Sequence, residues 1–123
     1  MSTGRLLVVA ADADVRQSLV FALETEGFTV TPSAELPTRA WLRENKFDCT
    51  VLDQRVLRGE PYESVAFCIA SHPVVLLAAK PFGWLLEWVS QVVETPVVED
   101  RLLQAVHAAS RPKPPATAET PAT

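Results

Sequence analysis

The sequence predicts an α/β fold in which a parallel sheet is covered by helices on both faces. Apolar runs of strand length alternate with segments of helical periodicity along most of the chain. The apolar runs are continuous, which is typical of strands buried on both faces. Acidic residues follow the run at 5–11, and the run at 49–53 ends on an aspartate. In folds of this class the carboxyl ends of the strands carry the functional groups.

The expected elements come from these runs and from the turn residues between them. Strands are expected at 5–11, 28–31, 49–53, 74–79 and 92–94. Helices are expected between the first two strands, at 33–45, from the turn at 58–61 up to about residue 70, at 84–90 and at 97–109. Asp12 or Asp14 can cap the first helix, because an aspartate accepts free N–H groups there. Gly27 suits the left-handed residue that ends it.

Two helices carry apolar stripes that should face the sheet. The spacing i, i+4, i+7, i+8 places one stripe on the first helix, and four apolar residues of the last helix lie on one side of it. The stripe residues are Val15, Leu19, Ala22 and Leu23, then Leu102, Leu103, Val106 and Ala109.

Composition limits the class of protein. The 123 residues have a net charge of −4 and a pI near 5.1, so no basic surface invites nucleic acid or an anionic membrane. No secretory signal and no membrane span is recognisable, so we expect a cytoplasmic protein with reduced cysteines. One domain is expected over 1–110, and the proline-rich 111–123 (RPKPPATAETPAT) is expected to be a disordered tail.

Motifs of enzymes and metal sites are missing from the sequence. Its four glycines form no GxGxxG, P-loop or GxSxG motif. Neither His72 nor His107 has Cys or His at metal-ligand spacing. We therefore expect a protein that is not an enzyme and holds no metal, with a flavodoxin-like small-molecule-binding domain as a distant alternative.

Residues 5–109 resemble the receiver domain of two-component response regulators. Four stretches carry the resemblance: LLVVAADADVRQSLVFALETEGFTV, FDCTVLDQRV, HPVVLLAA and VVETPVVEDRLLQAV. It implies a CheY-like, flavodoxin-like (βα)5 fold, doubly wound, with five parallel strands in the order 2-1-3-4-5. It also implies a role in phosphorelay signal transduction. Residues 80–91 are shorter than the corresponding part of the family, which indicates a shortened fourth helix region.

The resemblance places the family's phosphoacceptor on Asp53, which would take a phosphoryl group from a histidine kinase. The other site residues of the family are replaced here. Its acidic pair falls on Ala10 and Ala11, its Thr or Ser on Ala78, its Lys on Thr95 before Pro96, its switch aromatic on Val92, and its proline and glycine on Leu57 and Pro61.

These replacements remove the groups that phosphoryl transfer needs. Mg²⁺ takes oxygen ligands, and methyl groups at 10 and 11 supply none. Rate in this chemistry comes from positioning and from neutralising charge. We expect weak or no Mg²⁺ binding and a degenerate receiver, a pseudo-receiver, that acts as a phosphorylation-independent interaction module. The alternative is a slow phosphoacceptor on Asp53.

Three charged residues could compensate for the missing groups. Asp12 could move toward Asp53 as a metal ligand, or simply cap its helix. Arg55 or Lys80 could reach the carboxylate of Asp53 and hold the domain in one state, or remain in water. Asp53 itself could serve only to accept N–H groups of its own loop.

Aromatic residues after the fourth strand suggest a partner surface. Trp84 and Trp88 are four apart and would share one face of a short helix beside Phe82. Aromatic residues are enriched at binding hot spots. The expected partners are a histidine kinase, an output protein or a second copy of the chain. Alternatively, the aromatic residues fill space left by the shortened segment.

Overall fold

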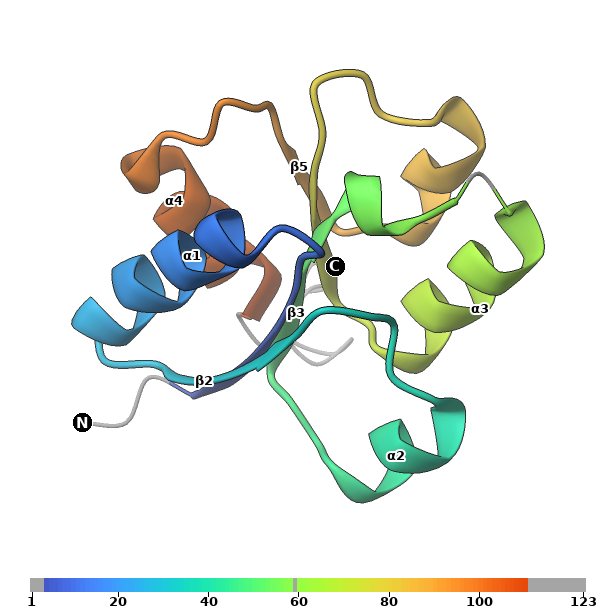
Figure 1. The fold of residues 1–123 in the computed structure, drawn as a ribbon, viewed down its shortest axis with the longest axis horizontal. Helices are drawn as coiled ribbons and strands as arrows, with labels where there is room; N and C mark the ends of the chain where they lie inside the picture. Colours follow the sequence, from blue (N-terminus) through green and yellow to red (C-terminus); the bar gives the residue numbers. More distant parts are fainter. Residues whose placement is uncertain (1–3, 59, 111–123) are drawn as a thin grey trace, which may run out of the picture.

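The computed structural model describes residues 4–58 and 60–110, which form one sheet with helices on either side (Figure 1). The strands are β1 (Arg5–Val9), β2 (Thr29–Ser33), β3 (Cys49–Asp53), β4 (Val74–Leu77) and β5 (Gln91–Val93). The helices are α1 (Ala13–Thr25), α2 (Arg39–Glu44), α3 (Pro61–Ala70) and α4 (Glu99–Ser110), with 3-10 helices η1 (Gln54–Val56) and η2 (Gly83–Trp88).

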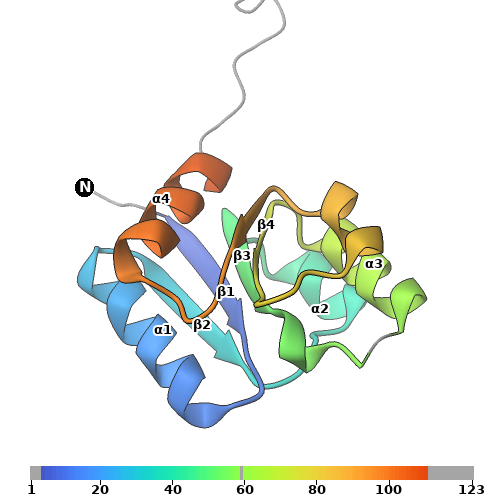
Figure 2. The ribbon, with the colours of Figure 1, turned by 90° about the horizontal axis from the view of Figure 1, so that it is seen from above.

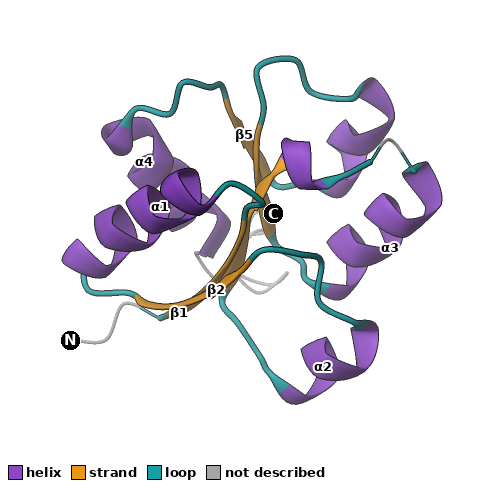
Figure 3. Ribbon diagram, viewed as in Figure 1, coloured by secondary structure: helices purple, strands orange, loops and turns teal. Residues whose placement is uncertain are grey.

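The five strands are all parallel and lie in the order β2-β1-β3-β4-β5. Both the α/β class and this strand order are confirmed. The order reverses direction between β1 and β3, so the loops after these two strands diverge to opposite faces of the sheet. Figure 3 shows the strands in orange with purple helices on both sides, joined by teal loops. Because the strands are parallel, the loops that follow them leave from the same edge of the sheet. That carboxyl edge is where this class of fold carries its functional groups.

Each face of the sheet has its own apolar core. Side chains alternate along β1, so Leu6 and Val8 pack with α1 and α4, while Leu7 and Val9 pack with α2 and α3. Figure 2 shows α1 and α4 on one side of the sheet and α2 and α3 on the other. The predicted stripes of α1 and α4 face the first core, where Leu19, Leu23, Leu102 and Val106 are buried.

The ends of α1 follow their sequence signals. Asp12 is the N-cap, and its Oδ1 accepts hydrogen bonds from the N–H groups of Asp14 at 2.8 Å and Val15 at 3.1 Å. Gly27 follows the helix with φ of 101°, a left-handed conformation that glycine adopts without steric cost. The helix therefore begins and ends close to the residues that the sequence predicts.

The helix expected over 33–45 is wrong in its first half. Ser33 is the last residue of β2, and α2 begins only at Arg39, with Thr38 as its N-cap. Pro37 explains the difference, because the residue before a proline is disfavoured in the helical conformation. Residues 34–37 therefore run without helix, and a shorter α2 covers the second face.

The helix expected over 84–90 is a 3-10 helix, η2, over Gly83–Trp88. Short connecting segments often adopt this tighter form. The strands β4 and β5 are also shorter or shifted by one or two residues relative to the expected 74–79 and 92–94. The expected tail at 111–123 lies outside the described residues. No helix in the described part of the chain is long and apolar enough to cross a membrane.

Candidate functional site at the carboxyl edge of the sheet

Asp53 is the last residue of β3, and its side chain is 4% exposed. Its Oδ1 accepts a hydrogen bond from the N–H of Arg55 at 3.0 Å, which makes Asp53 the N-cap of η1. This is the loop contact that the sequence left open as one role of Asp53. The carboxylate therefore helps to fix the loop after β3.

The guanidinium of Arg55 lies against the same carboxylate. Its Nη2 donates to Oδ2 at 2.8 Å, and its Nε is 3.2 Å from Oδ1 and 3.3 Å from Oδ2. The hydrogen bond to Asp53 and the charge of that carboxylate raise the pKa of Arg55, and the charge of Asp12 adds to this. The side chain of Arg55 is 65% exposed and that of Asp53 is 4% exposed, so the cation lies on the solvent side of the buried carboxylate. Such fork-shaped pairing is the strong form of an arginine–carboxylate contact.

The other two charged candidates lie elsewhere. Lys80 is exposed, and within residues 4–58 and 60–110 the ion pair of Asp53 is with Arg55. Asp12 uses its Oδ1 to cap α1. Of the three proposed substitutes, the structure brings only Arg55 into contact with Asp53.

The end of β1 holds a cation that the sequence analysis missed. Nη1 of Arg16 donates to the carbonyl oxygens of Ala10 at 2.8 Å and Ala11 at 3.2 Å. Long side chains in a helix point back toward its N-terminus, so an arginine in the first turn of α1 can reach this loop. That direction is the signal in the sequence that could have found it.

The other positions that the resemblance assigns to the site are placed as follows. Ala10 and Ala78 are buried at the ends of β1 and β4, and Ala11 is exposed. The N–H of Ala78 donates to the carbonyl oxygen of Val93 at 3.1 Å. Thr95 is partly buried and precedes a cis proline, Pro96. Val92 is 39% exposed, Leu57 is buried and Pro61 is the first residue of α3.

The residues present do not fit a magnesium ion. The carboxylate of Asp53 is occupied by the Arg55 guanidinium. Methyl groups stand at positions 10 and 11, and the carbonyl oxygens there accept from Arg16. A second cation would meet a positive charge at both sets of oxygens, where Mg²⁺ needs free oxygen ligands. We therefore derive no chemical step through a metal.

Gln54 is a second residue that the sequence analysis missed. Its Nε2 donates to the carbonyl oxygen of Lys80 at 3.0 Å, and its Oε1 accepts from the N–H of Phe82 at 2.9 Å. The side chain therefore joins η1 to the loop after β4. No pattern in the sequence predicts a contact between residues 26 and 28 positions apart.

The aromatic residues after β4 do not form the predicted pair. Phe82 and Trp84 stack, with ring centroids 5.1 Å apart and an interplanar angle of 10°. Trp84 and Trp88 are 37% and 38% exposed. A 3-10 helix has about 3.0 residues per turn, so positions four apart are rotated by roughly 120° and do not share a face. The expectation of a Trp84–Trp88 face is wrong because η2 is not an α-helix.

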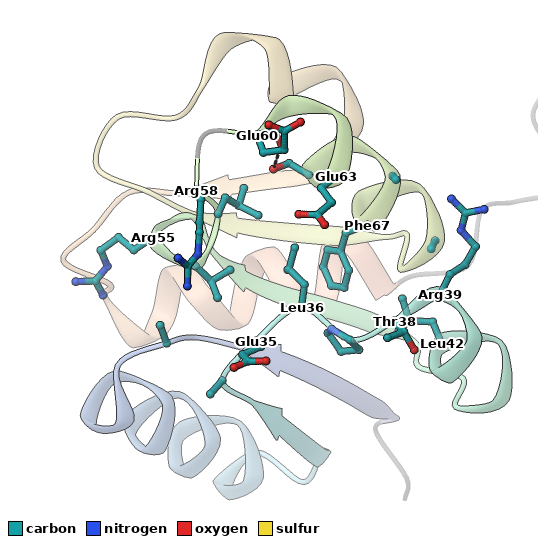
Figure 4. A pocket seen from close by; sticks show the side chains of 18 residues that line it. Glu35, Leu36, Thr38, Arg39, Leu42, Arg55, Arg58, Glu60, Glu63 and Phe67 are labelled. Atoms are coloured by element: carbon teal, nitrogen blue, oxygen red, sulfur yellow. Dashed lines mark hydrogen bonds between the residues drawn. The ribbon is translucent and has the colours of Figure 1, made fainter.

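A groove of about 760 Å³ lies between α3 and the segment that leads into α2 (Figure 4). Leu36, Leu42, Leu57 and Phe67 give it an apolar floor, and Glu63 reaches toward that floor from α3 in Figure 4. Charges of both signs also line it: Arg39, Arg55, Arg58, Glu35, Glu60 and Glu63. The unpredicted stretch without helix before α2 forms one wall of this groove.

Comparison with known structures places the fold. A CheY-like response regulator receiver domain protein from Methanospirillum hungatei JF-1 superposes with a TM-score of 0.75 at 18% identity, over 89% of this chain and 94% of that one. This is the receiver fold. Full-length FixJ from B. japonicum gives a TM-score of 0.71 at 24% identity, over 98% of this chain and 62% of that one. The chemotaxis protein CheY4 of Vibrio cholerae gives 0.71 at 17% identity.

A curated protein matches part of the sequence. The transcriptional regulator protein FixT of Rhizobium meliloti (strain 1021) is 38% identical over 63 residues, which are 50% of this chain and 53% of that protein. This chain thus spans about half the length of its curated relative. No family model matches the sequence.

Proposed function

We propose that this chain is an atypical receiver domain of two-component signalling that binds a protein partner without being phosphorylated. One observation carries the proposal. The Arg55 guanidinium holds the carboxylate of Asp53 through three hydrogen bonds, at the place where a typical receiver would accept a phosphoryl group. The receiver fold and the partial match to FixT support the signalling role.

The chemistry of the edge supports a fixed state. A phosphoryl acceptor needs a free carboxylate and groups that neutralise charge on the transferred oxygens. Asp53 is buried and already paired, and Ala10, Ala11 and Ala78 supply no oxygen or hydroxyl from their side chains. Arg55, which neutralises Asp53, belongs to the same chain. No metal ion or phosphoryl group is therefore needed to fix the conformation of the loop after β3. The domain then acts as an interaction module and not as an enzyme.

The proposed partner is a histidine kinase or an output protein in the cytoplasm. Exposed apolar side chains support such contacts, and Trp84, Leu86 and Trp88 of η2 supply three of them. Large aromatic side chains contribute strongly at the centre of interfaces. Homodimerisation through the same residues is the competing arrangement. Sedimentation velocity of the wild type and of Trp84→Ala, with exposed Phe21→Ala on α1 as the matched control, separates the two.

Phosphorylation is tested by mass. The protein is incubated with acetyl phosphate and Mg²⁺, and its intact mass is measured beside that of Asp53→Ala. We expect no adduct in either sample. A gain of ~80 Da, the mass of one phosphoryl group, that is lost in Asp53→Ala would show a working phosphoacceptor and overturn the proposal.

The second candidate, a slow phosphoacceptor on Asp53, has one supporting observation. The exposed Arg55 could turn from the carboxylate to a phosphoryl oxygen, since guanidinium groups bind both. This candidate predicts a slow adduct in the wild type that becomes slower still in Arg55→Ala. Under the first proposal, neither protein gains mass.

Mg²⁺ gives a companion test that does not depend on phosphorylation. Millimolar Mg²⁺ should leave the melting temperature and the tryptophan fluorescence unchanged, because a ligand stabilises only the state that it binds. Ca²⁺ at the same ionic strength is the control for nonspecific screening. A rise in melting temperature specific to Mg²⁺ would contradict the argument that the residues of this site do not fit a magnesium ion.

A further inference from the structure

Gln54 joins two loops that are separate along the chain. It lies on η1 between Asp53 and Arg55, and both polar atoms of its amide are used. Nε2 donates to the carbonyl oxygen of Lys80, and Oε1 accepts from the N–H of Phe82. A glutamine has one acceptor oxygen and one donor amine at its tip, so it suits a backbone C=O and a backbone N–H that lie near each other.

These two hydrogen bonds join the loop after β4 to η1. Upstream, the N–H of Ala78 is bound to Val93, and downstream the N–H of Leu85 is bound to Phe82 within η2 itself. Among the described residues, the hydrogen bonds that tie residues 79–84 to another part of the molecule are the two from Gln54. The polar contacts of this loop are therefore made with η1, while Phe82 and Leu85 also pack against the second apolar core.

Contacts run without a break from the carboxylate to the aromatic rings. Asp53 caps η1 and binds Arg55, so its carboxylate fixes the turn that carries Gln54. Gln54 in turn holds the N–H of Phe82, and the Phe82 ring stacks on Trp84. A change at one end of such a chain of contacts has a direct physical route to the other end.

We propose that Gln54 is a positioning residue that couples the carboxylate of Asp53 to the position of the Phe82–Trp84 pair. While Arg55 holds the carboxylate, the pair is kept in one place on the surface. The use of this device in partner binding rests on the proposed function, whereas the coupling itself does not. A partner that docks on the rings would thereby meet them in the one arrangement that the Asp53–Arg55 pair maintains.

The first test measures the hydrogen bond to Phe82 directly. Amide hydrogen exchange is followed by NMR in the wild type, in Gln54→Met, which keeps the length of the side chain, and in Gln54→Glu, which keeps an acceptor oxygen. The N–H of Phe82 should exchange at least tenfold faster in Gln54→Met and stay protected in Gln54→Glu. Gln104→Met, at an exposed position of α4, is the matched control. Unchanged exchange at Phe82 in Gln54→Met would overturn the role of Gln54.

The second test measures coupling. The protein is labelled with 5-fluorotryptophan, and the ¹⁹F signal of Trp84 is assigned through Trp84→Phe. Asp53→Asn should shift this signal when Gln54 is present, and the shift should fall by at least half in the Gln54→Met background. An equal shift in both backgrounds, or no shift in either, would overturn the coupling.

The two proposals fail in different ways. A phosphoryl adduct of ~80 Da would overturn the phosphorylation-independent function and leave the Gln54 contact intact. Loss of the coupling in the ¹⁹F cycle would leave the unphosphorylated module standing. Should Gln54→Met fail to fold, Gln54→Glu still separates the two bonds, because it loses the donor to Lys80 and keeps the acceptor for Phe82.

Discussion

The two faces of the sheet are covered in different ways. On one face, α1 and α4 have 13 and 12 residues and close over the core with their predicted stripes. On the other, α2 and η2 have six residues each, and only α3 reaches ten. The second face carries the groove of about 760 Å³ and the exposed Trp41, Trp84 and Trp88. Longer helices thus cover the first face, and shorter helices and a groove lie on the second.

The largest effect on the free energy of unfolding is expected when one core leucine from each face is replaced. Leu102→Ala on α4 should lower the free energy of unfolding by about 3 kcal/mol, since the side chain is fully enclosed and the cavity cannot collapse. Leu42→Ala on α2, which lines the groove, should cost about 1–2 kcal/mol, because the short helix can relax toward open space. Urea unfolding measures both. Equal losses would mean that the second face is packed as tightly as the first.

A smaller effect is expected at the edge where the two faces meet. Arg55→Ala leaves the buried carboxylate of Asp53 with the backbone N–H of residue 55 as its remaining partner. The free energy of unfolding should fall by about 1–2 kcal/mol, at the low end because the exposed guanidinium is screened by solvent.

The matched double variant sharpens this result. Adding Asp53→Asn to Arg55→Ala removes the unpaired charge and should recover part of the loss, as measured by the same urea titrations. If Arg55→Ala alone costs nothing, the pair does not hold the loop, and the proposed fixed state loses its basis.

The smallest effect is expected in the alkylation rates of two buried thiols, one from each core. Burial raises the pKa of Cys49 to about 12 and that of Cys68 to about 11, from an ordinary 9.0. Cys49 belongs to the core of the first face and Cys68 to that of the second. Both should resist alkylation at pH 8, because the thiolate is the nucleophile, and Cys68 should react first. Mass spectrometry of the labelled peptides gives the order, and the reverse order would contradict the comparison.

The same thiols predict a loss of stability at alkaline pH. Above pH 9 the unfolded chain ionises its thiols while the folded chain keeps them protonated, so the unfolded state is favoured as pH rises toward 11 or 12. Each thiol should lower the free energy of unfolding by about 1 kcal/mol between pH 8 and pH 10. Cys49→Ala should flatten this slope, and an unchanged slope would assign it to other groups.

The sequence predicts those features that depend on neighbours along the chain. The buried run ending on Asp53, the cap at Asp12 and the left-handed Gly27 are local signals, and the structure has all three. The parallel sheet follows from the alternation of elements, and its order from the resemblance to receivers. These parts of the fold needed no knowledge of side-chain contacts across loops.

The rest depends on contacts between distant residues or on competition between conformations. Gln54 acts through a side chain that reaches a loop far along the chain, and its residue type does not signal this by itself. The contact of Arg16 is with the loop before its own helix, and only the backward direction of helical side chains could have indicated it. The helix expected over 33–45 has Pro37 in its first half, and the sequence does not decide whether that proline only restricts the first turn or delays the helix to Arg39. The segment of η2 required a choice between two helical forms that periodicity does not decide. The wrong expectation that Trp84 and Trp88 share a face followed from choosing the α-helical form.

Arg16 also determines what an engineer would meet on trying to restore a metal-dependent switch. Its guanidinium already lies 2.8 Å from the Ala10 carbonyl oxygen, at the end of β1. Aspartates introduced at 10 and 11 would have a permanent counter-ion beside them before any solvent ion arrived. Reversion of these two positions should therefore yield new internal salt bridges, and metal affinity should emerge only when Arg16 is replaced as well, as calorimetric Mg²⁺ titration of the double and triple variants can show.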